Sequence, residues 1–153
     1  MEAIEKAGYT PGGDCHLALD TAATEFSKSP GRYDLHREGM SFLSEELIEM
    51  YETLKRDYPI ISIEDGLSED DWDAWQVMNR RLGDKLQIVG DDLFATRLEL
   101  IRRGIEMDAG NAVLLKLNQV GTVTETLDAI ATAKEAGWGT IISHRSGETE
   151  DSS

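Results

Sequence analysis

Residues 59–65 read PIISIED, residues 86–92 read LQIVGDD, and residues 112–118 read AVLLKLN. In each stretch a run of apolar residues, several of them β-branched, leads into a charged residue. Continuous apolar runs of this length are typical of parallel strands that are covered on both faces. Because the carboxyl ends of parallel strands lie on the same side of a sheet, the pattern predicts that these charged residues gather at one face of an α/β domain.

Two further apolar runs flank these three, HLALD at residues 16–20 and GTIISHR at residues 139–145. Segments with the spacing of amphipathic helices separate the five runs, at residues 41–58, 68–82, 96–107 and 122–136. This alternation predicts repeated βαβ units, and therefore an α/β fold with about five parallel strands and flanking helices.

The connection after the first strand contains a smaller predicted feature. Residues 26–36 read FSKSPGRYDLH, in which a Pro-Gly turn separates two short flanks, and this pattern predicts a surface hairpin. Residues 2–7 have the composition of a short helix. No low-complexity segment or linker divides the chain, so we expect one domain over residues 1–153.

Local signals predict where the helices begin and end. Gly83, Gly104 and Gly137 are expected to terminate helices, because glycine is favoured just beyond the last helical turn. Ser68 and Thr122 are expected to cap helices, because an acidic residue stands three positions after each of them.

Composition excludes several classes of function. Thirty acidic and fifteen basic residues give a net charge of -15, which argues against a nucleic-acid partner because phosphates would be repelled. No stretch approaches the ~20 apolar residues of a membrane span. The single cysteine, Cys15, cannot form an internal disulfide and fits a reducing compartment, so we expect a cytoplasmic protein.

Acidic residues stand at the ends of three predicted strands: Asp20 after the first, Glu64 and Asp65 after the second, and Asp91 and Asp92 after the third. A single aspartate in such a place is usually a helix cap or a turn residue. Three such strands bring at least three acids to one opening, and oxygen ligands of high charge suit Mg²⁺. For Asp65 and Asp92, capping the next helix or pairing with a lysine or arginine is an equally good interpretation.

Lys116 interrupts the apolar run LLKLN. A lysine within a strand either extends its ammonium to solvent or takes part in chemistry. Next to a cluster of acids, it is a candidate general base.

Five strings taken together resemble one known family. They are ALDTAATEF (18–26), ISIEDG followed by EDDW (61–66 and 69–72), VGDDLFAT (89–96), LLKLNQVGTVTET (114–126) and SHRSGETED (143–151). In this order they closely resemble the barrel domain of enolase, phosphopyruvate hydratase. The resemblance covers essentially the whole chain, and the fourth and fifth strings are its most specific elements.

The resemblance implies a Mg²⁺-dependent lyase of glycolysis that dehydrates 2-phosphoglycerate to phosphoenolpyruvate. It implies that Asp20, Glu64 and Asp91 bind Mg²⁺ and that Lys116 removes the C2 proton of the substrate. A lysine base that works with Mg²⁺ is the pattern of this superfamily.

The same resemblance assigns the residues after the last predicted strand. His144 is implied to lie near the phosphate and the leaving hydroxyl, as a catalytic residue. Arg145 and Ser146 are implied to bind the substrate phosphate, to which a guanidinium offers a planar fork of donors.

Some parts of the family are not found in this sequence. These are the N-terminal domain, the early strands with two catalytic glutamates, and the last strands with a second lysine. A complete (β/α)₈ barrel takes ~250 residues. We therefore expect residues 1–153 to be an incomplete barrel domain, part of a TIM-type barrel, that is inactive by itself and self-associates through open barrel edges.

Three other interpretations remain open from the sequence. The chain could be a binding or interaction module derived from an enolase. It could be a receiver-like α/β domain, which also gathers acids around Mg²⁺ at strand ends. It could belong to another branch of the superfamily, such as a racemase or cycloisomerase, although SHRSGETED favours enolase itself.

Overall fold

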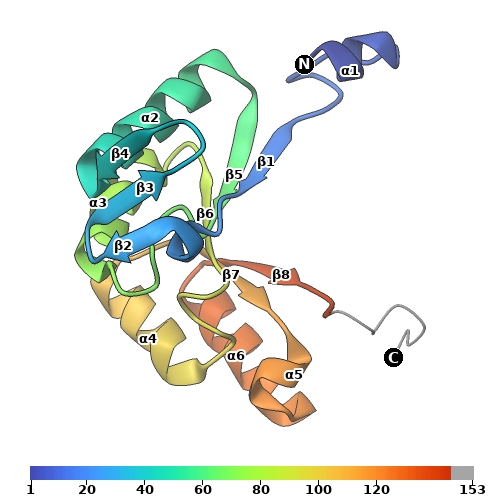
Figure 1. The fold of residues 1–153 in the computed structure, drawn as a ribbon. Helices are drawn as coiled ribbons and strands as arrows, with labels where there is room; N and C mark the ends of the chain where they lie inside the picture. Colours follow the sequence, from blue (N-terminus) through green and yellow to red (C-terminus); the bar gives the residue numbers. More distant parts are fainter. Residues whose placement is uncertain (146–153) are drawn as a thin grey trace.

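The computed structural model describes residues 1–145 and contains a five-stranded parallel sheet (Figure 1). Its strands follow the order β1-β5-β6-β7-β8. Their bounds are Leu17–Asp20 for β1, Ile60–Glu64 for β5, Gln87–Gly90 for β6, Ala112–Leu115 for β7 and Gly139–Ile142 for β8. Each falls within one of the five apolar runs, so the predicted α/β fold with five parallel strands is confirmed.

Helices connect the strands of this sheet. The long ones are α2 (Ser44–Asp57), α3 (Trp72–Leu82), α4 (Leu98–Met107) and α6 (Val123–Glu135). Shorter ones are α1 (Glu2–Lys6), the 3₁₀ turn η1 (Ala23–Phe26) and α5 (Leu117–Val120), and α5 was not predicted. Helix α1 stands apart from the body of the molecule and buries none of its residues (Figure 1).

The predicted helix boundaries are partly right. Thr122 caps α6 as expected, because its side chain accepts a hydrogen bond from the backbone N–H of Glu125. Ser68 does not cap α3, which begins four residues later at Trp72. Gly104 does not end α4: the helix continues to Met107 and closes at Asp108, which has a left-handed backbone with φ of 55°.

The predicted hairpin is a sheet of three antiparallel strands. They are β2 (Ser27–Ser29), β3 (Arg32–Leu35) and β4 (Met40–Leu43). Residues 41–43, which were predicted to begin a helix, instead pair with β3. Tyr33 ties this small sheet to the main body, because its hydroxyl donates to Asp71 at 2.8 Å and accepts from the N–H of Ser68 at 3.0 Å.

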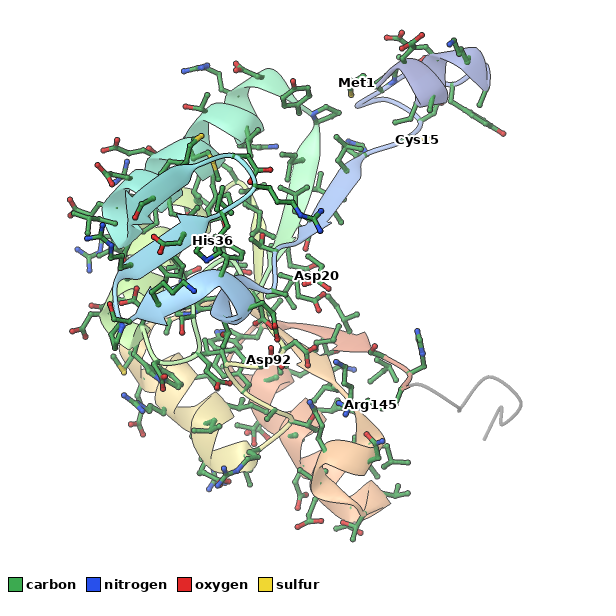
Figure 2. The ribbon with its side chains drawn as sticks, viewed as in Figure 1. Met1, Cys15, Asp20, His36, Asp92 and Arg145 are labelled. Carbon is green, nitrogen blue, oxygen red and sulfur yellow. The ribbon has the colours of Figure 1, made fainter. Side chains whose placement is uncertain are left out.

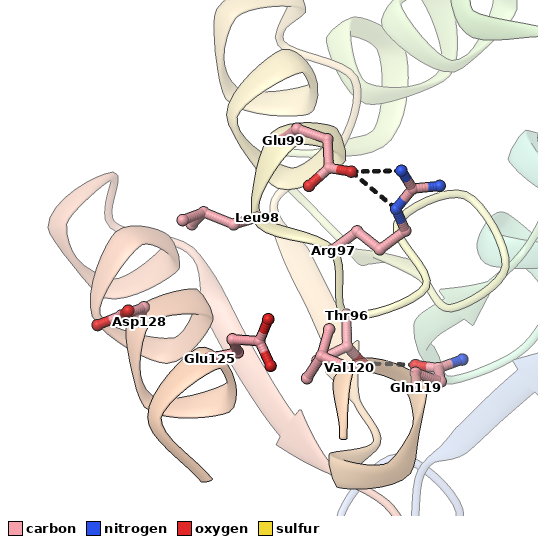
Figure 3. Close-up of a pocket in the computed structure, with 8 residues that line it drawn as sticks. All are labelled: Thr96, Arg97, Leu98, Glu99, Gln119, Val120, Glu125 and Asp128. Carbon is pink, nitrogen blue, oxygen red and sulfur yellow. Dashed lines mark hydrogen bonds and ion pairs between the residues drawn. The ribbon is translucent and has the colours of Figure 1, made fainter. Parts of the chain in front are cut away.

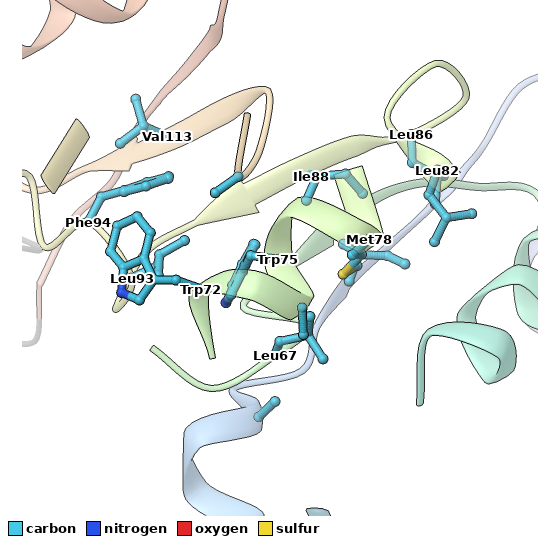
Figure 4. Close-up of a cluster of buried hydrophobic side chains, with 14 of the residues drawn as sticks. Leu67, Trp72, Trp75, Met78, Leu82, Leu86, Ile88, Leu93, Phe94 and Val113 are labelled. Carbon is cyan, nitrogen blue, oxygen red and sulfur yellow. The ribbon is translucent and has the colours of Figure 1, made fainter. Parts of the chain in front are cut away.

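The main core lies between the parallel sheet and its helices (Figure 4). Trp75 and Phe94 are fully buried there and Trp72 is nearly so, which identifies the two tryptophans of α3 as packing residues. Strand residues Ile63, Ile88 and Val113 reach the same core from the sheet. Burial of these aromatic and aliphatic side chains is the main stabilising contribution to the fold.

The opposite face of the sheet carries a smaller cluster made of strand residues, Val89, Ala112 and Leu114, with Ile141 packed against them. Every residue of β7 is buried, so this strand is covered on both faces as predicted, but the helices lie against only one of these faces. This one-sided arrangement is that of part of a TIM barrel, in which the other face lines the barrel interior. It differs from a doubly wound receiver-like fold, which carries helices on both faces.

Within residues 1–145, no helix has the length and apolar character that crossing a membrane requires.

Candidate functional site

Four of the predicted site residues fall on the helix-free face of the sheet at its carboxyl edge. Successive strand residues point to opposite faces. Leu19, Ile63 and Leu115 belong to the helix-side core. The residue that follows each of them, Asp20, Glu64 or Lys116, therefore lies on the other face.

Strand register places the first two acids side by side. Asp20 and Glu64 are direct partners in the β1–β5 pair, and Glu64 is in turn the partner of Val89 in β6. Val89 belongs to the cluster on the helix-free face, so Asp91, two residues further along, is directed to the same face. Asp91 is buried, with 8% of its surface exposed.

Burial and the neighbouring acids both raise the pKa of Glu64. Burial, followed by the charges of Asp20, Asp91 and Asp65, raises the pKa of the Glu64 carboxyl to about 7, and Lys116 partly offsets this rise. Burial and the neighbouring carboxylates both disfavour a charged Glu64, and a nearby positive charge would offset them. A divalent cation would supply it, so the donor set suits a hard cation such as Mg²⁺.

Lys116 and Asp91 form an ion pair between their Nζ and Oδ2 atoms. The lysine side chain is 15% exposed and the aspartate side chain 11% exposed. The Lys116 ammonium therefore does not extend to solvent, and it is held among the strand-end acids. A largely buried pair of this kind is stabilising only when both charges are well placed, since each has lost most of its hydration.

Asp65 has a partner that the sequence did not predict. Its two carboxylate oxygens accept hydrogen bonds from the backbone N–H groups of Asp91 and Asp92, each at 2.9 Å. It neither caps a helix nor pairs with a cation through these bonds. Asp65 is 3% exposed and has a positive φ of 43°, a left-handed conformation that aspartate adopts more readily than most residues other than glycine. It therefore connects the turn after β5 to the turn after β6.

A second set of acids could also hold a metal ion. Asp65, Asp91 and Asp92 each offer a carboxylate oxygen, and these atoms lie within 4.8 Å of one another. Asp91 belongs to both sets. Asp65 already uses both oxygens on backbone donors, which favours the set of Asp20, Glu64 and Asp91.

The residues after β8 lie next to Lys116 in the sheet. The N–H of Ser143 donates to the carbonyl of Leu115 at 2.9 Å, which places His144 and Arg145 just beyond the carboxyl end of β7. Both are exposed, and Figure 2 shows Arg145 on the same side of the molecule as Asp20 and Asp92. Ser146 lies outside the described residues.

Two residues of this region were given no role from the sequence. Thr96 and Gln119 are hydrogen-bonded to each other (Figure 3). Thr96 also contacts Lys116, and Gln119 contacts Asp91. Thr96 belongs to the string VGDDLFAT and Gln119 to LLKLNQVGTVTET, but neither residue type indicates a long-range contact by itself.

A family model described as "Enolase, C-terminal TIM barrel domain" matches residues 1–153. The match spans the chain from its first to its last residue, and so includes all five sequence strings.

Proposed function

The chain belongs to the enolase family of C-terminal TIM barrel domains, and on this premise we propose that its strand-end cluster is the Mg²⁺ site and proton-transfer centre of a phosphopyruvate hydratase. Two observations support the proposal: Asp20 and Glu64 are direct partners in the β1–β5 pair, and Lys116 forms an ion pair with Asp91. Residues 1–153 would then be an incomplete barrel domain of that enzyme.

In this proposal Asp20, Glu64 and Asp91 would hold Mg²⁺. Once bound, the ion would supply positive charge to a substrate carboxylate and so make the neighbouring C–H bond more acidic. Lys116 would take the C2 proton of 2-phosphoglycerate at its Nζ. The base must first be neutral, so the proton that it shares with Asp91 in the ion pair has to leave before catalysis.

His144, Arg145 and Ser146 would serve the other end of the substrate. The Arg145 guanidinium and the Ser146 hydroxyl would donate hydrogen bonds to the phosphate, and His144 would lie by the leaving hydroxyl. His144 and Arg145 lie just beyond the carboxyl end of β7, and this position supports the arrangement. The substrate and product, 2-phosphoglycerate and phosphoenolpyruvate, have the anionic groups that such donors recognise.

Three further parts of the proposal concern the chain as a whole. Without the catalytic glutamates and the second lysine that the family resemblance implies, residues 1–153 alone would not turn over substrate. Copies of the chain would associate through the edges of the sheet. The single cysteine and the acidic composition support a cytoplasmic location without nucleic-acid partners.

Calorimetric titration with Mg²⁺ tests the metal site. Glu64→Gln should weaken binding by at least ~10-fold, because it removes a charged ligand while it preserves shape. Asp92→Asn is the matched control and also distinguishes the two ligand sets, because Asp92 belongs only to the alternative set. Equal affinity in Glu64→Gln and wild type, with a loss in Asp92→Asn, would favour the alternative set and contradict the proposal.

Proton exchange at C2 of the substrate tests Lys116. In a complete enolase that carries these residues, Lys116→Ala should lower the exchange rate by ~10²- to 10⁴-fold, the usual contribution of a general base. Mg²⁺ affinity should remain measurable. Exchange at the wild-type rate would show that another group is the base.

A further inference from the structure

We propose that Thr96 is a positioning residue, which holds the backbone of Lys116 and, through Gln119, the carboxylate of Asp91. This inference rests on the proposed function, because Thr96 matters for catalysis only when Lys116 and Asp91 have the roles given above. The contacts themselves do not depend on those roles.

Thr96 has an unusual conformation for its residue type. Its φ is 57°, and the preceding Ala95 has a φ of 44°, so two consecutive residues are left-handed. A β-branched residue rarely adopts positive φ, and it persists only where the surroundings determine it. Thr96 is fully buried. A glycine or asparagine would suit this backbone better, so the threonine side chain must contribute something that they do not.

The hydroxyl of Thr96 makes two hydrogen bonds in different directions. Its Oγ1 accepts from the backbone N–H of Lys116 at 2.9 Å and donates to Oε1 of Gln119. Lys116 is the first residue after β7, where the strand ladder no longer fixes the backbone. The hydroxyl therefore provides the acceptor that orients Lys116 just beyond the strand.

The contacts close into a ring of four residues. Gln119 extends from Thr96 to Asp91, with its Nε2 3.5 Å from Oδ1 of the aspartate. The other oxygen of Asp91 is paired with the Lys116 ammonium. Lys116 returns to Thr96 through its backbone N–H. Each member thus has its orientation determined by two others, as preorganised sites require.

Hydrogen bonds in the turn after β6 also hold the backbone of Asp91. The N–H groups of Phe94 and Ala95 both donate to the carbonyl of Asp91, at 3.2 and 2.7 Å. The carboxylate of Asp65 holds the N–H of Asp91 at the other side of the same residue. Asp91 is consequently fixed through its backbone, and the ring described above fixes its side chain.

A pocket of about 420 Å³ adjoins the ring and is lined in part by Thr96, Gln119 and Glu125 (Figure 3). Two members of the ring, Thr96 and Gln119, therefore also line this pocket.

Three substitutions at one position separate the hydroxyl from the backbone. Thr96→Val removes the hydroxyl and keeps the β-branched shape, whereas Thr96→Ser keeps the hydroxyl. Thr96→Gly removes the hydroxyl and also relieves the left-handed strain, so it protects the test against a Thr96→Val protein that does not fold. The matched control is Thr126→Val, at a buried threonine whose hydroxyl bonds to the carbonyl of Thr122 within its own helix.

Two metal-free NMR signals in residues 1–153 report on positioning. Hydrogen exchange of the Lys116 amide should accelerate by ~10-fold or more in Thr96→Val and Thr96→Gly, since its acceptor is gone. The side-chain ε-CH₂ signal of Lys116 should also move toward that of an exposed lysine, such as Lys134. Thr96→Ser and Thr126→Val should leave both signals as in wild type.

Each outcome decides the proposal. Unchanged ε-CH₂ and amide signals in the hydroxyl-free variants would overturn it. Faster amide exchange with an unmoved ε-CH₂ signal would also overturn it. The Thr96 hydroxyl would then accept a hydrogen bond from the backbone of Lys116 without positioning the lysine side chain. Gln119→Met breaks the second arm without altering residue 96, and it should move the ε-CH₂ signal on its own. Failure of wild type to bind Mg²⁺ would count against the metal site and leave these readouts valid.

Discussion

Asp65 combines the position of a possible metal ligand with the hydrogen bonds of a structural residue. It follows a strand, lies among acids, and has an oxygen within 4.8 Å of those of Asp91 and Asp92. Its pKa is raised to about 6, chiefly by burial, while the two backbone N–H groups that it accepts from lower the pKa. Those two bonds give the carboxylate a structural task at each oxygen.

Tyr51 supports the same region from the helix side and leads to a prediction about pH. It is 1% exposed, and its hydroxyl donates to the carbonyl of Gly66 at 2.8 Å. Burial raises the pKa of Tyr51 to about 12. An unfolded tyrosine ionises near pH ~10, so the folded state favours the neutral phenol and this contribution to stability is complete below pH ~10. It should be lost as the pH rises through about 12.

Urea unfolding of Tyr51→Phe measures both effects. At pH ~7 the variant should lose ~1 kcal/mol, the net value of one hydrogen bond. It should also lose less stability than wild type on going from pH ~9.5 to ~11.5, since it has one fewer phenol to ionise. Tyr58→Phe, at an exposed position, is the control. An alkaline loss in Tyr51→Phe equal to that in wild type would contradict the assignment.

At the scale of elements, the parallel strands were predictable because their apolar runs are local and continuous. The strand β4 was missed because Ser41–Leu43 precede a helix with compatible spacing, and their pairing with β3 depends on the Pro-Gly turn and on Tyr33. The sequence could single out the acids and Lys116 as candidates from local signals. Asp20 and Glu64 are the last residues of their strands, and Asp91 and Lys116 directly follow theirs. Asp65, Thr96 and Gln119 act through partners 20 or more residues away in sequence, which spacing does not reveal.

Gly104 in α4 was misread for a related reason. An isolated glycine in a helical pattern resembles a stop signal, but Gly104 lies inside α4 and next to aromatic rings of the core. A Cβ at this position would come within 2.5 Å of Phe94 and 3.0 Å of Trp138. The glycine therefore allows close approach of α4 to these rings, which are themselves in contact at 5.3 Å between centroids.

Gly104→Ala should consequently destabilise the protein despite the better helix propensity of alanine. Propensity favours alanine by ~1 kcal/mol, whereas overpacking of a tight core costs ~1–3 kcal/mol. We expect a net loss of ~1 kcal/mol in urea unfolding, together with changed near-ultraviolet dichroism from the displaced rings. Glu106→Ala, on the exposed side of the same helix, should change stability by less than ~0.5 kcal/mol. A more stable Gly104→Ala protein would show that α4 can move away from the core.

For the whole molecule, the sheet ends in two strands, β1 and β8, that each pair on one side within the described residues. Large apolar side chains are exposed near β8. Ile142 on the strand is 69% exposed, and Val123 and Leu127 on α6 are 62% and 57% exposed. Unpaired strand edges beside apolar side chains are sites of association. The net charge of -15 opposes contact between copies, and salt screens that repulsion.

We therefore predict that residues 1–153 self-associate through the β8 edge, more strongly at high salt. Sedimentation velocity at ~100 µM protein should detect dimers or larger species whose population grows between ~0.02 and ~0.5 M salt. Ile142→Lys should shift the distribution toward monomer, because a lysine on an edge strand opposes pairing. Met40→Lys adds the same charge at an exposed position of the small sheet and should not. Because the added lysine lowers the net negative charge in both variants, only a difference between them identifies the edge. A wild-type chain that stays monomeric in ~0.5 M salt would contradict the prediction, since repulsion would then no longer explain the absence of association.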